Sequence, residues 1–258
     1  MHFDHQNTRG CYNAREVDAS WLQWCQKLLE PVDKTVIDLG CGGGIYARGF
    51  IQAGASHVYA LDSSEQYIQE AAGDNPFPGQ LDFIHADACA VPLGDAVADI
   101  LFERAMVHHL NETQKLSNLR EARRLLKPDG LLVIQDRTFD DILDISPQSW
   151  IRSTLFECFP RLLEFEEKRC PSTASYLRLM KQAGFTDIQQ LQYREVRKRY
   201  PDFEALATEI KSRKGKSILY ELSENELKLY CQKLKIKSLS HPLVETDRWS
   251  VWLANNTR

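Results

Sequence analysis

The sequence predicts an α/β protein built on a parallel β-sheet with helices on both faces. Short apolar runs alternate with helical patterns between residues 35 and 134, and short connections join them. A glycine turn, Gly40–Gly44, follows the first apolar run and opens the first of these helices. Ligands of such sheets bind beyond the carboxyl ends of the strands, so the residues that end each strand are the candidate binding residues.

Each element of this alternation has its own signal. An amphipathic helix over residues 21–30 ends at Pro31, and a helical pattern that starts at Thr113 stops at Lys127–Gly130. We expect the strands of this region at residues 35–39, 58–61, 81–84, 98–102 and 131–134.

The pattern changes after residue 140. We expect a long helix over roughly residues 147–183, a strand over 188–196 and a closing strand over 249–253. Residues 201–238 show two polar, amphipathic helical patterns. We expect these two helices to form an insertion in the sheet domain (residues 197–240), not an independent unit.

The bulk composition is that of a soluble globular protein. The 258 residues are 43% apolar and 26% charged, which suits one large α/β domain or a domain with an insertion. The net charge is −4 without a basic block, so we expect no nucleic-acid partner. Seven scattered cysteines lack metal-binding spacing, so we expect no metal. We see no signal peptide and no membrane-spanning stretch, and expect a cytoplasmic protein.

The glycine turn predicts a nucleotide-type ligand, and Asp38 indicates which kind. Glycines at positions 40, 42 and 44 permit positive φ and a close approach of backbone to ligand, but the spacing is not the dinucleotide fingerprint. A carboxylate two residues before the first glycine would repel a pyrophosphate and favour a cationic group such as an α-ammonium. Charge therefore favours a nucleotide that bears an amino acid, with S-adenosylmethionine the expected one. The alternative is that Asp38 only fixes the turn by accepting backbone N–H groups.

Two further acidic residues end the next strands. Asp62 lies 22 residues beyond Gly40, a separation that suits acceptance of hydrogen bonds from ribose hydroxyls; a helix N-cap is the alternative. Asp87 follows the third strand, where a carboxylate could accept from an adenine amino group, and a plain turn aspartate is the alternative. Because three carboxylates end three successive strands beside one glycine turn, we expect a three-point site.

These segments resemble the class I S-adenosylmethionine-dependent methyltransferases, in particular the small-molecule group that includes ubiquinone and menaquinone methyltransferases. The matching pieces follow the family's order and spacing over residues 35–136, at residues 36–44, 60–64, 85–88, 99–110 and 126–134. The resemblance implies a Rossmann-like, doubly wound sheet of seven strands, mostly parallel with an antiparallel last strand. It also implies S-adenosyl-L-methionine as cofactor and S-adenosyl-L-homocysteine as product.

The resemblance also implies roles for individual residues around the cofactor. Asp38, Gly40 and Gly42 would contact the methionine part, Asp62 the ribose hydroxyls, and Asp87 with Ala88 the adenine. Ser63 and Cys41 are also expected among the cofactor-binding residues. Arg104 would pass the methionine sulfur and offer backbone atoms. Cys41 belongs to the same turn, and we interpret its side chain as packing because nothing nearby in the sequence would activate it.

His108 and His109, after the fourth strand, are the candidates for a general base, which a hydroxyl or protonated amine acceptor would need. Paired histidines are common at this place in the family, so shaping the pocket is the alternative; for catalysis we favour His109. Tyr12 and Arg15 lie in a stretch that often forms a lid over the cofactor in the family, and a solvated arm is the alternative. We therefore divide the chain into a helical lid (1–30), a sheet domain (31–196 and 241–258) and the insertion.

We expect a methyltransferase that acts on a small molecule by in-line transfer, as a monomer or homodimer, with residues 197–240 walling the acceptor pocket. The alternatives are an RNA or protein methyltransferase, or a cofactor-binding regulator without turnover. The Asn-Pro-Pro-Tyr signature of N6-adenine enzymes is absent from Glu103–Met106. Arg213, Lys214 and Lys216 predict a solvated turn, with contact to an acidic substrate group as the alternative.

Overall fold

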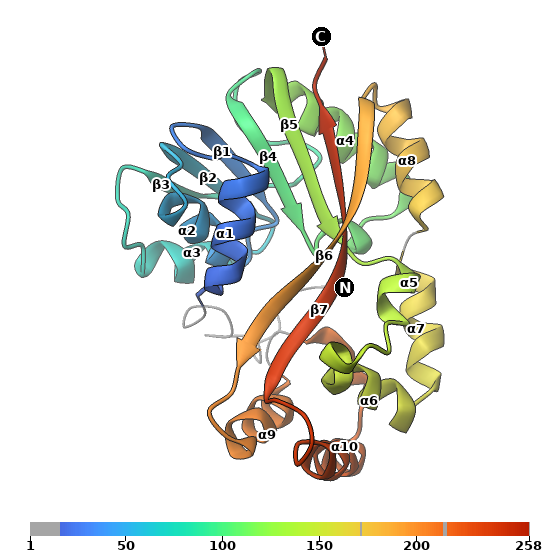
Figure 1. The fold of residues 1–258 in the computed structure, drawn as a ribbon. Coiled ribbons are helices and arrows are strands. Elements are labelled where there is room, and N and C mark those ends of the chain that lie inside the picture. The colour runs from blue at the N-terminus through green and yellow to red at the C-terminus, as the bar shows by residue number, and fades with distance from the viewer. Residues whose placement is uncertain (1–15, 171, 214–215, 258) are drawn as a thin grey trace.

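Seven strands form one sheet in the computed structural model, which describes residues 16–170, 172–213 and 216–257. The strands lie in the order β3-β2-β1-β4-β5-β7-β6 (Figure 1). Their bounds are β1 Thr35–Leu39, β2 His57–Asp62, β3 Leu81–His85, β4 Ala98–Arg104, β5 Leu126–Asp136, β6 Thr186–Arg199 and β7 Val244–Asn255.

The first five strands pair in parallel, and β7 lies antiparallel between β5 and β6. The prediction of a seven-stranded, mostly parallel sheet with an antiparallel last strand is therefore confirmed. The chain order reverses between β1 and β4, which are neighbours in the sheet. Connections on either side of such a point diverge and leave a crevice at the carboxyl ends of the strands.

Helices cover both faces of the sheet (Figure 1). One face carries α1 (Ala19–Leu28), α2 (Ile45–Gln52) and α3 (Glu65–Gly73), and the other carries α4 (Glu112–Leu125) and α8 (Thr173–Gln182). Trp21 of α1 is fully buried and meets the Phe50 ring of α2 edge-on, with the ring centroids 5.4 Å apart. The first helix is therefore part of the apolar core of the sheet domain.

A further apolar cluster lies beside the sheet and forms what we call the helical lobe, residues 139–169 and 203–237. The described residues of its second part are 203–213 and 216–237. Its helices are α5 (Phe139–Ile142), α6 (Trp150–Cys158), α7 (Arg161–Arg169), α9 (Phe203–Ser212) and α10 (Glu224–Lys237). The buried hydroxyl of Tyr230 on α10 donates a hydrogen bond to the carbonyl oxygen of Ile151 on α6 at 2.6 Å. The inserted helices therefore pack against α6, and the long strands β6 and β7 run from the sheet to α9 and α10 (Figure 1).

Two element predictions were wrong in detail. The helix expected over residues 147–183 is divided into α6, α7 and α8, because Pro160 stands at the start of α7 and Ser172 caps the start of α8. The helix α4 ends at Leu125, just before Lys127–Gly130, as expected. The next strand starts earlier than expected, because β5 begins at Leu126 and includes Lys127–Gly130, with a register shift against β4. Within the described ranges, no helix has the length and apolar composition needed to cross a bilayer.

Candidate active site

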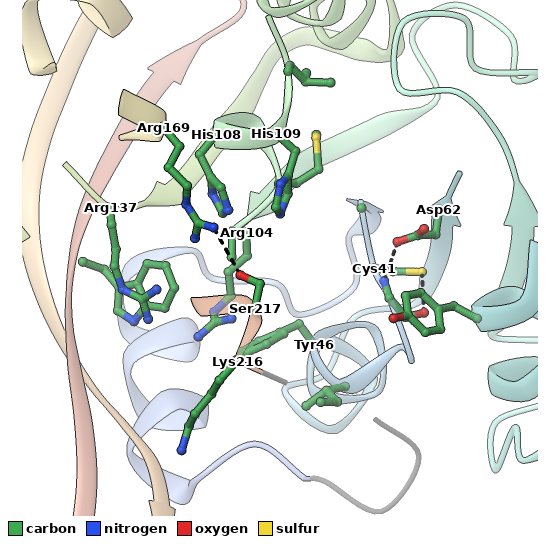
Figure 2. Close-up of a pocket in the computed structure, with 18 of the residues that line it drawn as sticks. Cys41, Tyr46, Asp62, Arg104, His108, His109, Arg137, Arg169, Lys216 and Ser217 are labelled. Atoms are coloured by element: carbon green, nitrogen blue, oxygen red, sulfur yellow. Dashed lines mark hydrogen bonds between the residues drawn. The ribbon is translucent and has the colours of Figure 1, made fainter. Parts of the chain in front are cut away.

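A cavity of about 480 Å³ lies at the carboxyl ends of the parallel strands and reaches the helical lobe (Figure 2). One part, which we call the cofactor half, contains every described residue that the sequence predicted for the cofactor: Asp38, Gly40, Cys41, Gly42, Asp62, Ser63, Asp87, Ala88 and Arg104. The other part, the acceptor half, is lined by Arg137 after β5 and by residues of β6, β7 and the lobe, among them Arg152, Glu166, Arg169, Arg197, Lys216, Glu245 and Trp249.

The glycines of the turn serve two different purposes. Gly40 and Gly42 have φ of 81° and 53°, in the left-handed region that favours glycine. A Cβ on Gly40 would lie 2.5 Å from the Cγ of Met106, so packing against the protein excludes a side chain there. A Cβ on Gly42 would meet no protein atom within 4 Å and would enter open space instead. Gly42 therefore presents a bare backbone surface that a ligand can approach.

Asp62 is held in place by two backbone groups at the end of β2. Its carboxylate accepts the N–H of Gly42 at 2.8 Å and the N–H of Ser64 at 2.9 Å. The N-cap of α3 is Ser64, whose hydroxyl accepts from Tyr67, so capping is not the role of Asp62. The fixed carboxylate lines the cavity and retains lone pairs that can accept ribose hydroxyls.

Asp38 is a buried carboxyl at the end of β1. Its exposed fraction is 2%, and no group in the described part of the chain gives its Oδ2 a hydrogen bond. Burial, followed by repulsion from Asp62, raises the pKa of Asp38 to about 7. A cation in the cavity would satisfy this oxygen and stabilise the ionised form, which fits the ammonium group expected from the sequence.

The other predicted cofactor residues also reach the cavity. Asp87 is exposed, accepts the N–H of Cys89 at 2.8 Å and stands with Ala88 beyond β3. Ser63 follows Asp62 on the same wall. Cys41 is buried, and burial raises the pKa of its thiol well above the usual value, which agrees with a packing role.

The side chain of Arg104 is part of an ion-pair network that the sequence did not predict. Its Nη2 lies 2.6 Å from Oε2 of Glu195 on β6, and the Tyr46 hydroxyl donates to the same carboxylate. The guanidinium lies over the rings of Tyr46 and Trp249, with its Cζ 4.2 Å and 4.3 Å from the two centroids. Arg104 therefore ties β4 to β6 and forms a wall between the two halves of the cavity.

His108 is oriented by a carboxylate at the end of β5. Its Nδ1 lies 2.9 Å from Oδ1 of Asp136, and the backbone N–H groups of His108 and Arg137 also donate to that carboxylate. Burial favours the neutral acid, but His108 and these donors together lower the pKa of Asp136 to about 2. Because the carboxylate only accepts hydrogen bonds, Nδ1 carries the proton and Nε2 of a neutral His108 is left as the acceptor.

His109 has a different environment. Its ring stands 3.9 Å from that of His108, centroid to centroid, and is accessible from the cavity. Desolvation by the surrounding walls, followed by the nearby charges of His108 and Arg169, lowers the pKa of His109. The carboxylate partner belongs to His108, so the geometry favours His108 as the base, whereas the sequence analysis favoured His109. Asp136 itself could have been found, because it ends a strand as Asp38 and Asp62 do.

The acceptor half contains most of the residues that the sequence analysis missed. Lys216, expected in a solvated turn, is only 9% exposed at its side chain, and its Nζ lies 2.8 Å from Oε2 of Glu245. That expectation was wrong for Lys216, because its side chain is buried against Glu245 on β7. The expected lid residues Tyr12 and Arg15 lie outside the described residues, as does Lys214.

The cofactor half fits S-adenosylmethionine on three independent observations. Gly42 offers an open backbone surface, Asp38 has a buried oxygen that lacks a partner among the described residues, and Asp62 is a fixed acceptor between them. These two carboxylates and the open backbone therefore suit a ligand with one cationic end and vicinal hydroxyl groups.

Comparison with known families agrees with this fit. Residues 37–134 match the family model described as a methyltransferase domain. The histone-arginine methyltransferase CARMER of Drosophila persimilis is 33% identical over 100 residues, which are 38% of this chain and 19% of that protein. This chain thus spans about a fifth of the length of the curated relatives it matches.

Solved structures share the fold along most of the chain. A protein of Anabaena variabilis, assigned as a methyltransferase of an antibiotic biosynthesis pathway, superposes with a TM-score of 0.70 at 16% identity, covering 93% of this chain and 98% of that one. A phosphoethanolamine N-methyltransferase of Haemonchus contortus, solved with phosphomonomethylethanolamine and S-adenosylhomocysteine, gives a TM-score of 0.57 at 17% identity. That match covers 95% of this chain and 55% of the other. At these identities the likeness shows the fold alone.

Proposed function

Because the chain carries a domain of the class I S-adenosylmethionine-dependent methyltransferase family, we propose that it transfers the methyl group of this cofactor to a small-molecule acceptor in the acceptor half of the cavity. The main support is that one cavity joins the cofactor half to a second, polar half. Its volume of about 480 Å³ lies in the range of small-molecule pockets. Residues of α6, α7 and the insertion line the acceptor half, which supports a role of these segments in specificity.

The residues of the chain bind the cofactor, orient the methyl acceptor and take up its proton. The bound cofactor supplies a sulfonium methyl group that is already activated for in-line displacement. Asp38 holds its ammonium, Asp62 with Ser63 its ribose hydroxyls, and Asp87 with Ala88 its adenine. His108 then takes the proton of a hydroxyl or ammonium acceptor on Nε2, while Asp136 holds the ring and stabilises the imidazolium that forms.

A protein-arginine acceptor is the runner-up, because the curated relatives are named for it. The match covers 38% of this chain, and the acceptor half is rich in arginines that would repel a guanidinium substrate. An RNA acceptor has less support, since the chain has a net charge of −4. A regulator without turnover would keep the cofactor half and lose only methyl transfer.

Two measurements test the proposal. Isothermal titration with S-adenosylhomocysteine should give saturable binding, and its absence would overturn the proposal. Incubation with methyl-labelled cofactor should then transfer label to a small-molecule extract. Parallel incubations use protein and RNA fractions. Label found only on protein would favour the runner-up, label found only on RNA would favour the RNA acceptor, and binding without any transfer would favour the regulator.

A further inference from the structure

The acceptor half concentrates basic side chains from separate parts of the chain. Among the described residues, five arginine and lysine side chains line this half, and they are between 9% and 19% exposed: Arg137, Arg152, Arg169, Arg197 and Lys216. Arg137 follows β5, Arg152 lies on α6, Arg169 ends α7, Arg197 lies on β6, and Lys216 precedes the short helical turn Ser217–Glu221. Burying so many cations is costly unless each finds a counterion.

One buried carboxylate serves three of these arginines. Asp247 is 1% exposed, and Arg137 reaches its Oδ2 at 2.5 Å, Arg152 its Oδ1 at 2.9 Å and Arg197 its Oδ2 at 3.3 Å. Two carboxylate oxygens thus receive three guanidinium groups, and a single negative charge cannot neutralise them. Their excess charge faces the cavity.

The other counterions do not remove the excess. Glu245 pairs with Lys216 at 2.8 Å and lies 3.9 Å from Arg197, while Glu166 lies 3.4 Å from Nε of Arg169. Among the described residues, Glu209 also lies 3.6 Å from Nζ of Lys216, so the five cations meet four carboxylates, and Glu209 is shared with a sixth cation, Lys198. Arg104 does not change this balance, since Glu195 pairs with it.

Arg137 and Arg169 retain donors for a ligand. The Nε–H of Arg137 is buried and has no hydrogen-bond partner among the described residues. That of Arg169 also makes no hydrogen bond to a described residue, although a carboxylate oxygen of Glu166 lies 3.4 Å away. Arg137 lies flat on the Trp249 ring, with Cζ 3.9 Å from the centroid, and burial together with repulsion from Arg152 lowers its pKa to about 10. Arg169 donates one bond to the Ser217 hydroxyl at 3.3 Å, and Figure 2 shows its head turned into the pocket beneath the histidines.

We propose that the methyl acceptor carries an anionic carboxylate or phosphate group, which Arg137 and Arg169 bind while the nucleophile faces His108. The fork of a guanidinium matches the paired oxygens of both groups. The anion would supply the negative charge that Asp247, Glu245 and Glu166 do not provide. That the anion belongs to the methyl acceptor rests on the proposed function; the anion site itself does not.

The test titrates inorganic phosphate and malonate into the full chain at constant ionic strength, with and without S-adenosylhomocysteine, and includes neutral malonamide as a control. We expect saturable anion binding, no malonamide binding, and a dissociation constant at least about tenfold higher in Arg169→Gln. Arg169→Lys should restore part of the affinity. Arg161→Gln, which alters an exposed arginine at the other end of α7, should bind as the unmodified protein does.

The outcomes separate this inference from the proposed function. Absence of anion binding, or equal binding by Arg169→Gln, would overturn the inference even if S-adenosylhomocysteine binds. Should Arg169→Gln fail to fold by circular dichroism, Arg137→Gln gives the same comparison. If S-adenosylhomocysteine does not bind but the anions do, the proposed function fails and the anion site stands. The preferred probe, phosphate or malonate, identifies the anionic group.

Discussion

The carboxylate of Asp62 accepts the backbone N–H of Gly42 at 2.8 Å, and this bond ties the end of β2 to the glycine turn after β1. Two parts of the cofactor site that lie 20 residues apart in the chain are thereby held together in the free protein. Such preorganisation lowers the entropy that binding must remove.

Replacing Asp62 therefore tests the ribose contact. Asp62→Ala removes an acceptor for ribose hydroxyls and loosens the turn, so we expect the dissociation constant of S-adenosylhomocysteine to rise at least about tenfold in isothermal titration. Asp82→Ala, at an exposed position on β3 beside His57, is the matched control and should leave the constant unchanged. An unaltered constant in folded Asp62→Ala would contradict the contact.

The two glycines should respond differently to alanine. Gly40→Ala places a methyl group against Met106 in a left-handed backbone, and we expect it to lower the free energy of unfolding by about 2–4 kcal/mol. Gly42→Ala meets no protein atom, so its backbone strain should cost only about 1 kcal/mol while the methyl group weakens cofactor binding. Denaturant unfolding and titration measure the two effects. Equal destabilisation by both variants would argue against this distinction.

Asp38 should make cofactor binding depend on pH near neutrality. Its pKa of about 7 in the free protein means that the carboxyl is mostly protonated below that pH. A bound ammonium favours the ionised form, so binding releases a proton and affinity falls as the pH is lowered. We expect roughly a tenfold loss between about pH 8 and about pH 6, measured with S-adenosylhomocysteine. Asp38→Asn cannot titrate and should bind weakly at both pH values; a persistent pH dependence in this variant would assign the effect elsewhere.

His108 and His109 can be separated by kinetics once an acceptor fraction is labelled. His108→Ala removes the proposed base and should lower kcat by about 100-fold or more, because general-base catalysis contributes at least this factor. Asp136→Asn should lower kcat as well, since the amide no longer favours the Nδ1–H tautomer. His109→Ala leaves the pair of His108 and Asp136 intact and should act mainly on KM. A larger kcat loss in His109→Ala than in His108→Ala would restore the assignment made from sequence.

The cofactor half was predictable because its signals are local. A strand pattern ending in Asp38, a turn that needs positive φ at Gly40 and Gly42, and an acid ending the next strand are all read within a short stretch of chain. Parallel strands bring their carboxyl ends to one edge, so their order alone gathers these residues. The structure then brought every described member of the predicted set to one cavity.

The acceptor half could not be read in this way. Arg137, Arg152 and Arg197 lie in three separate parts of the chain, and no spacing in the sequence relates them to Asp247. Packing of α6 and α7 against α10 buries them together, and burial turns ordinary surface residues into partners of one carboxylate. The same is true of Lys216, which resembles a solvated residue in sequence and is paired with Glu245 in the fold.

The sequence by itself predicted the sheet, the likeness to methyltransferases and the residues that line the cofactor half, because apolar periodicity and backbone conformation are properties of neighbouring residues. Only the tertiary structure decided which histidine has a carboxylate partner, which glycine faces open space and how positive charge collects in the acceptor half. Those features depend on desolvation and on distances between segments far apart in the chain, and a linear sequence contains neither.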